Sequence, residues 1–121
     1  MTDTAIATIT TTEVETLEQF YSLPERAEVI QFIDKFPFLL PVLLEAPEKI
    51  RRYFPEEPLV LKVVRDPEIA DYVQLVLSIL TTLEPMEAVD RQNQLERYWW
   101  SGVSLQVWKQ LCVLLEYPDD F

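Results

Sequence analysis

Nine prolines and a single glycine constrain what this chain of 121 residues can fold into. Proline fixes φ near about −65° and has no N–H to donate, so it is tolerated in the first turn of a helix and interrupts helices and strands elsewhere. Pro24 and Pro85 stand where helical patterns begin, whereas Pro55 and Pro118 close segments. The prolines therefore divide the chain into short helices and strands that form one small domain.

Apolar residues recur at spacings of three and four in several segments, which predicts helices over residues 13–21, 24–36, 37–54 and 85–101. Pro47 lies well inside the third pattern, so we expect a kink or a restart near Ala46. Gly102 follows the last helix, where a glycine can adopt a positive φ at no steric cost. We therefore predict that Gly102 caps this helix.

Apolar and polar residues alternate over residues 59–64, 72–80 and 109–117, which predicts three half-buried strands. The class is α+β: N-terminal helices followed by a small, three-stranded, mainly antiparallel sheet, in the order helix-strand-strand-helix-strand. We expect a hairpin between the first two strands and place the third beside the first, in the spatial order second-first-third. Residues 1–12 are predicted to be a flexible N-terminal arm, and residues 13–121 a single α+β domain.

The composition argues against catalysis and against nucleic acid. The chain has no histidine and one cysteine, so few acid–base or nucleophilic groups are present, and we predict no catalytic, cofactor-binding or metal-ligating residue and no cofactor. A net charge of −11 repels phosphates and anionic membranes, and it favours a basic protein partner. With a single thiol, no export signal and no apolar span, the predicted location is cytoplasmic.

The most enzyme-like local feature is the trio Asp66, Glu68 and Asp71 between the first two strands. Carboxylates bind Mg²⁺ and Ca²⁺ through oxygen, but the central glycine and the spacing of an EF-hand loop are missing. Aspartate beside proline is also typical of a solvated turn. A small divalent-metal-dependent hydrolase or transferase that uses these three residues is therefore kept as the alternative function.

Aromatic residues gather around Gly102, where Trp99, Trp100 and Trp108 lie close in sequence. Adjacent helical residues point about 100° apart, so at most one of Trp99 and Trp100 faces the core. We predict that Trp99 packs inside and that Trp100 lies half-exposed, where it contributes either to the core or to a recognition surface.

The alternation of the strands also defines a second face of the sheet, which carries Val60, Val64, Val76, Leu80, Cys112 and Leu114 together with Lys62, Gln74, Ser78 and Glu116. This face is too apolar to be fully solvated and too polar to form a dry core. Either the N-terminal helices or another chain must cover it. The candidate interface residues are Val60, Val64, Val76, Leu114 and Trp100.

From residue 36 to residue 117 the chain resembles a group of small cyanobacterial proteins. The resemblance rests on Lys49-Ile50-Arg51, Tyr53-Phe54-Pro55, Asp66-Pro67-Glu68, Trp99-Trp100 and Leu111-Cys112. Pro47 departs from the unbroken helix that the resemblance implies there. No activity, cofactor or catalytic residue is established for the group, so the resemblance implies none for this chain.

The residues therefore favour a non-catalytic, acidic protein–protein interaction module, an adaptor or an antitoxin-like protein, that binds a protein partner or a second copy of itself.

Overall fold

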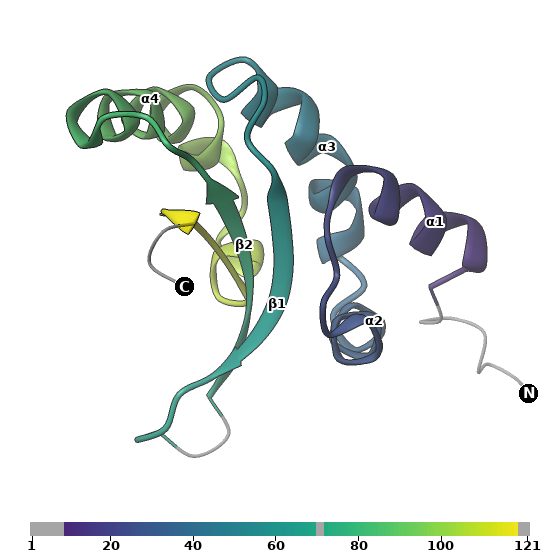
Figure 1. The fold of residues 1–121 in the computed structure, drawn as a ribbon. Helices are drawn as coiled ribbons and strands as arrows, with labels where there is room; N and C mark the ends of the chain where they lie inside the picture. Colours follow the sequence, from purple (N-terminus) through teal and green to yellow (C-terminus); the bar gives the residue numbers. More distant parts are fainter. Residues whose placement is uncertain (1–8, 70–71, 119–121) are drawn as a thin grey trace, which may run out of the picture.

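The computed structural model of the chain describes residues 9–69 and 72–118. Three helices precede a hairpin of two strands, and a long connection with further helical segments leads to the last strand (Figure 1). The elements are α1 (Thr11–Phe20), α2 (Arg26–Lys35), α3 (Leu39–Arg51), β1 (Leu59–Arg65), β2 (Val73–Leu80), α4 (Pro85–Tyr98), the 3-10 helix η2 (Trp100–Gly102), α5 (Leu105–Trp108) and β3 (Leu111–Glu116). The predicted α+β class is confirmed.

The sheet has the order β1-β2-β3, so β2 is the central strand. β1 and β2 are antiparallel, with Leu61 opposite Leu77. β2 and β3 are parallel, with Leu77 opposite Val113. The predicted spatial order second-first-third is therefore wrong, and so is the expectation that the last strand pairs antiparallel.

Two features of the fold explain the observed strand order: the pairing of Ser22 with β1 and the path of the chain between β2 and β3. The segment between α1 and α2 occupies the outer edge of β1, because Ser22 N donates to Leu59 O at 2.8 Å and Leu61 N donates to Ser22 O at 3.0 Å. On the other side, α4, η2 and α5 carry the chain back along the sheet, so β3 begins beside the start of β2. A return through a helical crossover yields a parallel pair.

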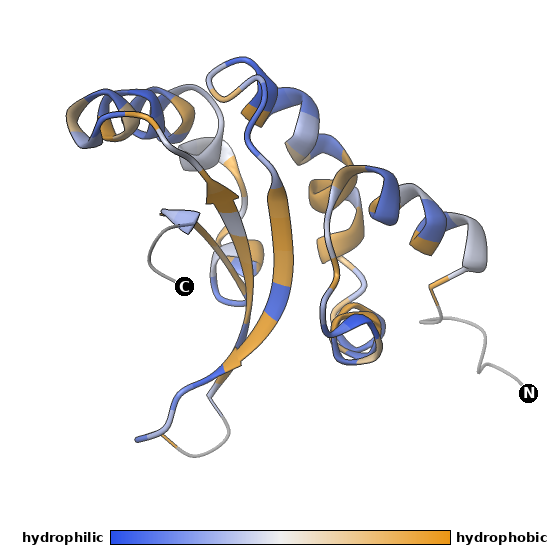
Figure 2. Ribbon diagram, in the orientation of Figure 1, coloured by the Kyte–Doolittle hydropathy of each residue, from blue (hydrophilic) through white to orange (hydrophobic). Residues whose placement is uncertain are grey.

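The core lies between one face of the sheet and the helices. Figure 1 shows α1, α2 and α3 together on one side of the sheet, and Leu95 of α4 and Val107 of α5 belong to the same hydrophobic core. Each buried aliphatic side chain of this kind stabilises the fold by about 1.5–3 kcal/mol. The sheet contributes Leu59, Leu61, Leu75, Leu77, Ile79 and Leu111 to this core. In Figure 2 the strands are correspondingly hydrophobic over most of their length.

Helix α3 runs without interruption through Pro47, which is buried. Of the two alternatives predicted near Ala46, a kink or a restart, the restart is therefore wrong. A proline inside a helix leaves the carbonyl four residues earlier without its usual donor, and here that carbonyl, Leu43 O, accepts a hydrogen bond from the Tyr21 hydroxyl at 2.6 Å. The helix continues because another side chain supplies the missing donor.

The connection between α4 and β3 also differs from the prediction. The helix ends at Tyr98, and Gly102 lies in η2 without a positive φ, so the predicted glycine cap is wrong. Gly102 N donates to Trp99 O at 3.0 Å within this tight turn. The four-residue helix α5 then follows, capped by Ser104, whose hydroxyl accepts from Val107 N.

The prediction of a flexible N-terminal arm over residues 1–12 is wrong for residues 9–12. Ile9 is buried, and its N–H donates to Asp34 Oδ1 at 2.5 Å. Thr10 caps α1 in a capping box with Glu13, in which each side chain accepts from the backbone N–H of the other residue. Residues 1–8 lie outside the described residues. Within the described ranges, no helix is long and apolar enough to cross a bilayer.

Candidate protein interface

The second face of the sheet is assembled as the sequence predicts. Across the three strands, Val60 lies opposite Ser78 and Ser78 opposite Leu114, which forms one row. In the next row, Val76 lies between Lys62 of β1 and Cys112 of β3. Val60, Val64, Val76 and Leu114 therefore share one face, and none of the four belongs to the core that the helices cover.

The apolar residues of this face differ in exposure. Val64, near the hairpin, is 44% exposed, whereas Val76, on the central strand, is 7% exposed. Val60, Cys112 and Leu114 are half-buried. The first of the two expectations for this face, coverage by the N-terminal helices, is wrong, because α1 to α3 lie on the opposite side of the sheet (Figure 1).

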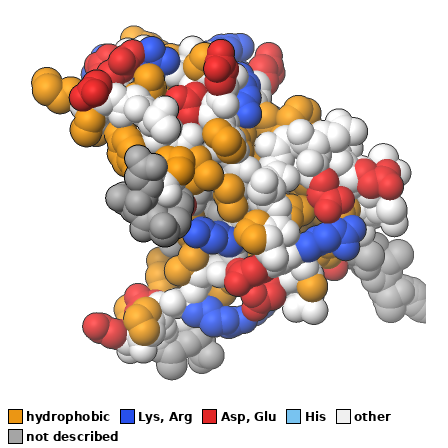
Figure 3. Space-filling view, in the orientation of Figure 1, with side chains coloured by type: hydrophobic (Ala, Val, Ile, Leu, Met, Phe, Trp, Pro, Cys, Tyr) orange, Lys and Arg blue, Asp and Glu red, His pale blue; other side chains and the backbone are white. Residues whose placement is uncertain are grey.

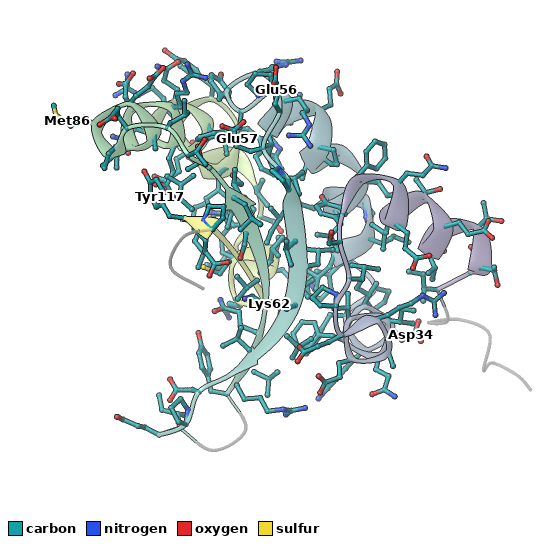
Figure 4. All side chains as sticks on the ribbon, viewed as in Figure 1. Asp34, Glu56, Glu57, Lys62, Met86 and Tyr117 are labelled. Atoms are coloured by element: carbon teal, nitrogen blue, oxygen red, sulfur yellow. The ribbon has the colours of Figure 1, made fainter. Side chains whose placement is uncertain are left out.

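Two opposite charges meet above the middle of this face. Lys62 Nζ lies 3.8 Å from Glu116 Oε1, and the two side chains are 33% and 26% exposed. Lys62 lies opposite Val76 of β2, and Glu116 lies opposite Leu80 of the same strand. Ser78 stands between those two β2 residues, so the ion pair crosses above this small, fully buried side chain. Figure 4 labels Lys62 beside the strands, on the side of the sheet away from α1 and α2.

The surface around the second face is partly apolar as well. Figure 3 shows hydrophobic side chains extending from α4 across to the sheet, with a basic group near the middle of the molecule. At the α4 end, Met86 is 87% exposed and Val89 is 49% exposed. In Figure 4, Met86 projects from the end of α4 into solvent. Contiguous apolar surface of this kind is typical of interaction sites.

Trp100 does not join this face. It lies in η2, packed against the helix-side core, with its ring 5.5 Å from that of Trp99 and 6.4 Å from that of Trp108. Trp108 Nε1 also donates to Trp100 O at 3.0 Å. Trp99 is buried, as predicted, and Trp100 is half-buried. The structure therefore places Trp100 away from the second face, in an aromatic cluster within the crossover connection.

Cys112 is a free, half-buried thiol on the second face. Burial raises the pKa of this thiol above its ordinary value. A raised pKa keeps the thiol protonated at neutral pH, and the protonated form is a poor nucleophile. Cys112 therefore serves as a small apolar residue of the face.

The carboxylates predicted as the alternative metal site are engaged locally. Asp66 Oδ1 accepts from Glu68 N at 2.7 Å and from Ile69 N at 3.1 Å, which closes the turn after β1. Asp71 lies outside the described residues. Among the residues that are described, no three histidine, cysteine or acidic side chains come close enough together to hold a metal ion.

Sequence reasoning missed a cleft on the helix side of the sheet, near the hairpin. It lies between α2, the paired ends of β1 and β2, and the turn before β3. Three of its lining residues are basic: Lys35, Arg65 and Lys109. These residues are far apart in the sequence and belong to no motif, so only the fold brings them together. We call this cleft the basic cleft.

Comparison with family models, with curated proteins and with solved structures gives no match. The resemblance to small cyanobacterial proteins therefore stays a prediction, and the geometry of the second face carries the functional argument.

Proposed function

We propose that this chain is a non-catalytic interaction module that binds a protein surface through the second face of its sheet. The observation that carries the proposal is an apolar sheet face whose residues lie outside the hydrophobic core that the sheet shares with α1, α2 and α3. Val60, Val76 and Leu114 form its centre, and Val64 extends it towards the hairpin. An adaptor or an antitoxin-like protein acts in this way, by covering a partner without chemistry.

The charge distribution supports a protein partner on this face. The whole chain carries a net charge of −11, yet the two charged residues of the second face, Lys62 and Glu116, pair with each other. An apolar surface with little net charge is typical of the core of an interface. The acidic surface around it would attract a basic partner and repel nucleic acid and anionic membranes.

The local chemistry supports a binding role over a catalytic one. The chain has no histidine. Burial raises the pKa of the Cys112 thiol, which favours its protonated form. The Asp66 carboxylate accepts a backbone hydrogen bond within a turn. General acid–base and nucleophilic catalysis require titratable groups aimed at a substrate. With its single cysteine, the module is expected to act in the reducing cytoplasm.

The test is the charge variant Leu114→Glu. Leu114 lies beside Glu116 on the same face, so the new carboxylate meets a like charge, whereas a carboxylate at position 76 would lie opposite Lys62. Leu105→Glu is the matched control, because Leu105 is 62% exposed on α5, outside the second face. We expect light scattering and pull-down with native partners to report loss of the assembly for Leu114→Glu alone, with unchanged circular dichroism.

The salt dependence of binding distinguishes self-association from binding to a basic partner. Two copies of an acidic chain repel each other, so self-association should strengthen between about 0.05 M and about 0.5 M salt, whereas binding to a basic partner should weaken. The rate of Cys112 alkylation by N-ethylmaleimide gives an independent readout, because a bound partner covers the thiol. If Leu114→Glu changes neither mass nor partner binding, and alkylation is independent of protein concentration and partner, the second face is not an interface.

A further inference from the structure

We infer that the basic cleft binds a small amphipathic organic anion, one that combines an aromatic or aliphatic body with a carboxylate. The cleft has a volume of about 410 Å³. Pockets that bind small ligands commonly enclose about 300–1,000 Å³. Its walls are Glu28, Gln31, Phe32, Lys35, Phe36, Val63, Arg65, Tyr72, Val73, Lys109 and Gln110.

The rim of the cleft is cationic, although the chain as a whole is strongly acidic. Among the described residues that line it, Lys35, Arg65 and Lys109 stand against one carboxylate, Glu28. Arg65 Nη2 lies 3.7 Å from Glu28 Oε2, but the arginine side chain is 68% exposed, so most of its guanidinium remains accessible. Three of the ten basic residues of the chain thus meet at one concavity. This arrangement attracts an anion locally, against the field of the whole molecule.

The floor of the cleft is apolar. The rings of Phe32 and Phe36 pack against each other with centroids 4.9 Å apart. Val63 and Val73 supply the floor from the two strands of the hairpin. Lys35 lies over the Phe36 ring at 5.5 Å, which places a cation directly beside the apolar surface. A ligand with an apolar body and an anionic head satisfies both parts of the cleft.

The floor and the rim together define the ligand class. An inorganic anion would leave the phenylalanine and valine surface exposed to water, and a neutral hydrophobic molecule would offer the ammonium groups of Lys35 and Lys109 no opposite charge. Guanidinium and ammonium groups bind carboxylates through charge-assisted hydrogen bonds. Gln31, Gln110 and Tyr72 add neutral polar groups that can orient the ligand.

This inference is independent of the proposed function, because the basic cleft and the second face lie on opposite sides of the sheet. The experiment is isothermal titration calorimetry of the full chain with 2-naphthoate and with octanoate. The uncharged amide of naphthoic acid serves as the ligand control. The test variant is Lys35→Gln/Lys109→Gln. The matched control is Lys49→Gln/Arg52→Gln, which removes one charge from α3 and one from the residue that follows it; these two residues pair with Glu45 and Glu48 and do not line the cleft.

We expect at least one of the two carboxylates to bind with a stoichiometry of one, and the amide to bind at least tenfold more weakly than naphthoate if naphthoate is the ligand bound. The Lys35→Gln/Lys109→Gln variant should lose at least tenfold in affinity, and the Lys49→Gln/Arg52→Gln variant should not. Leu114→Glu should bind the same ligand normally, which separates this site from the second face. The inference is overturned if neither carboxylate binds, if acid and amide bind equally, or if both double variants lose affinity to the same extent.

Discussion

The hydroxyl of Tyr21 donates to the carbonyl oxygen of Leu43 at 2.6 Å, in the interior between α1 and α3. Leu43 precedes Pro47 by four residues, so its carbonyl is the acceptor that Pro47 cannot serve. An unpaired buried carbonyl costs about 1–3 kcal/mol. Tyr21 therefore stands in for the missing backbone donor, and a side chain that ends one helix completes another.

Replacing Tyr21 by phenylalanine should lower the free energy of unfolding by about 1–3 kcal/mol, because the Leu43 carbonyl then lacks a donor. In a Pro47→Ala background the same change should cost less, since the alanine N–H returns to that carbonyl. Urea denaturation of the four proteins measures the coupling between the two sites. Tyr98→Phe, at a side chain that is 68% exposed, is the control. Strict additivity of Tyr21→Phe and Pro47→Ala would disprove the substitution of one donor for the other.

Stability should fall in alkaline solution through Tyr21. Burial raises the pKa of Tyr21 well above its ordinary value, and the nearby Arg51 guanidinium offsets part of this rise. Above pH about 10 the unfolded chain releases the phenolic proton while the folded chain retains it, so rising pH favours unfolding. The difference in free energy of unfolding between wild type and Tyr21→Phe should therefore be largest below pH about 10 and should decrease above it. Urea denaturation of both proteins across this range checks the sign, and a constant difference would contradict it.

Replacing Ser78 by alanine should leave stability unchanged or raise it by about 1 kcal/mol. The Ser78 hydroxyl is fully buried and has no hydrogen-bond partner among the described residues. Thr81 is the contrast, because it is also fully buried but donates to Glu57 Oε2 at 3.0 Å and accepts from Leu83 N at 3.1 Å. Thr81→Val should therefore destabilise by about 1–3 kcal/mol. Thermal melts of both variants measure these stability changes. A destabilisation of Ser78→Ala as large as that of Thr81→Val would show that the Ser78 hydroxyl has a hydrogen-bond partner.

Removing residues 1–12 should destabilise the protein by a few kcal/mol. The deletion removes Ile9, whose burial is worth about 1.5–3 kcal/mol, and Thr10, whose capping bonds are worth about 1 kcal/mol. A chain that begins at Ile9 keeps both side chains and is the matched control. The melting temperature should fall clearly for the longer deletion only. Equal melting temperatures for the two chains would show that Ile9 and Thr10 contribute nothing to the fold.

The sequence predicted the strands better than their order. Alternation placed all three strands within two residues of their observed ends, because a half-buried strand imposes a period of two on its residues. Strand order instead depends on Ser22, whose backbone occupies the edge of β1, and backbone pairing by a single residue leaves no composition signal. The four-residue helix α5 is too short to show a period. The restart predicted at Pro47 is wrong because the missing donor comes from Tyr21, which lies in a different segment.

The second face was predictable for the same reason as the strands. Val60, Val64, Val76 and Leu114 follow from alternation alone, and the ladder registers confirm that they share one face. Trp100 was assigned to the interface because of its chemistry, and the turn of η2 directs it to the core instead. The basic cleft had no local signal, since Lys35, Arg65 and Lys109 meet only through the packing of α2 on the sheet.

The parallel pairing of β2 with β3 bears on how the chain is made. The β1–β2 hairpin closes through a short connection, but β3 follows only after residues 81–110 have been synthesised. During that interval the other edge of β2 is bare and carries Leu75, Leu77 and Ile79. A bare apolar strand edge recruits other chains, and pairing across a long sequence separation is slow. Nascent chains of this protein therefore carry an unpaired strand edge until α4 and α5 bring β3 into place, and such an edge favours aggregation during synthesis.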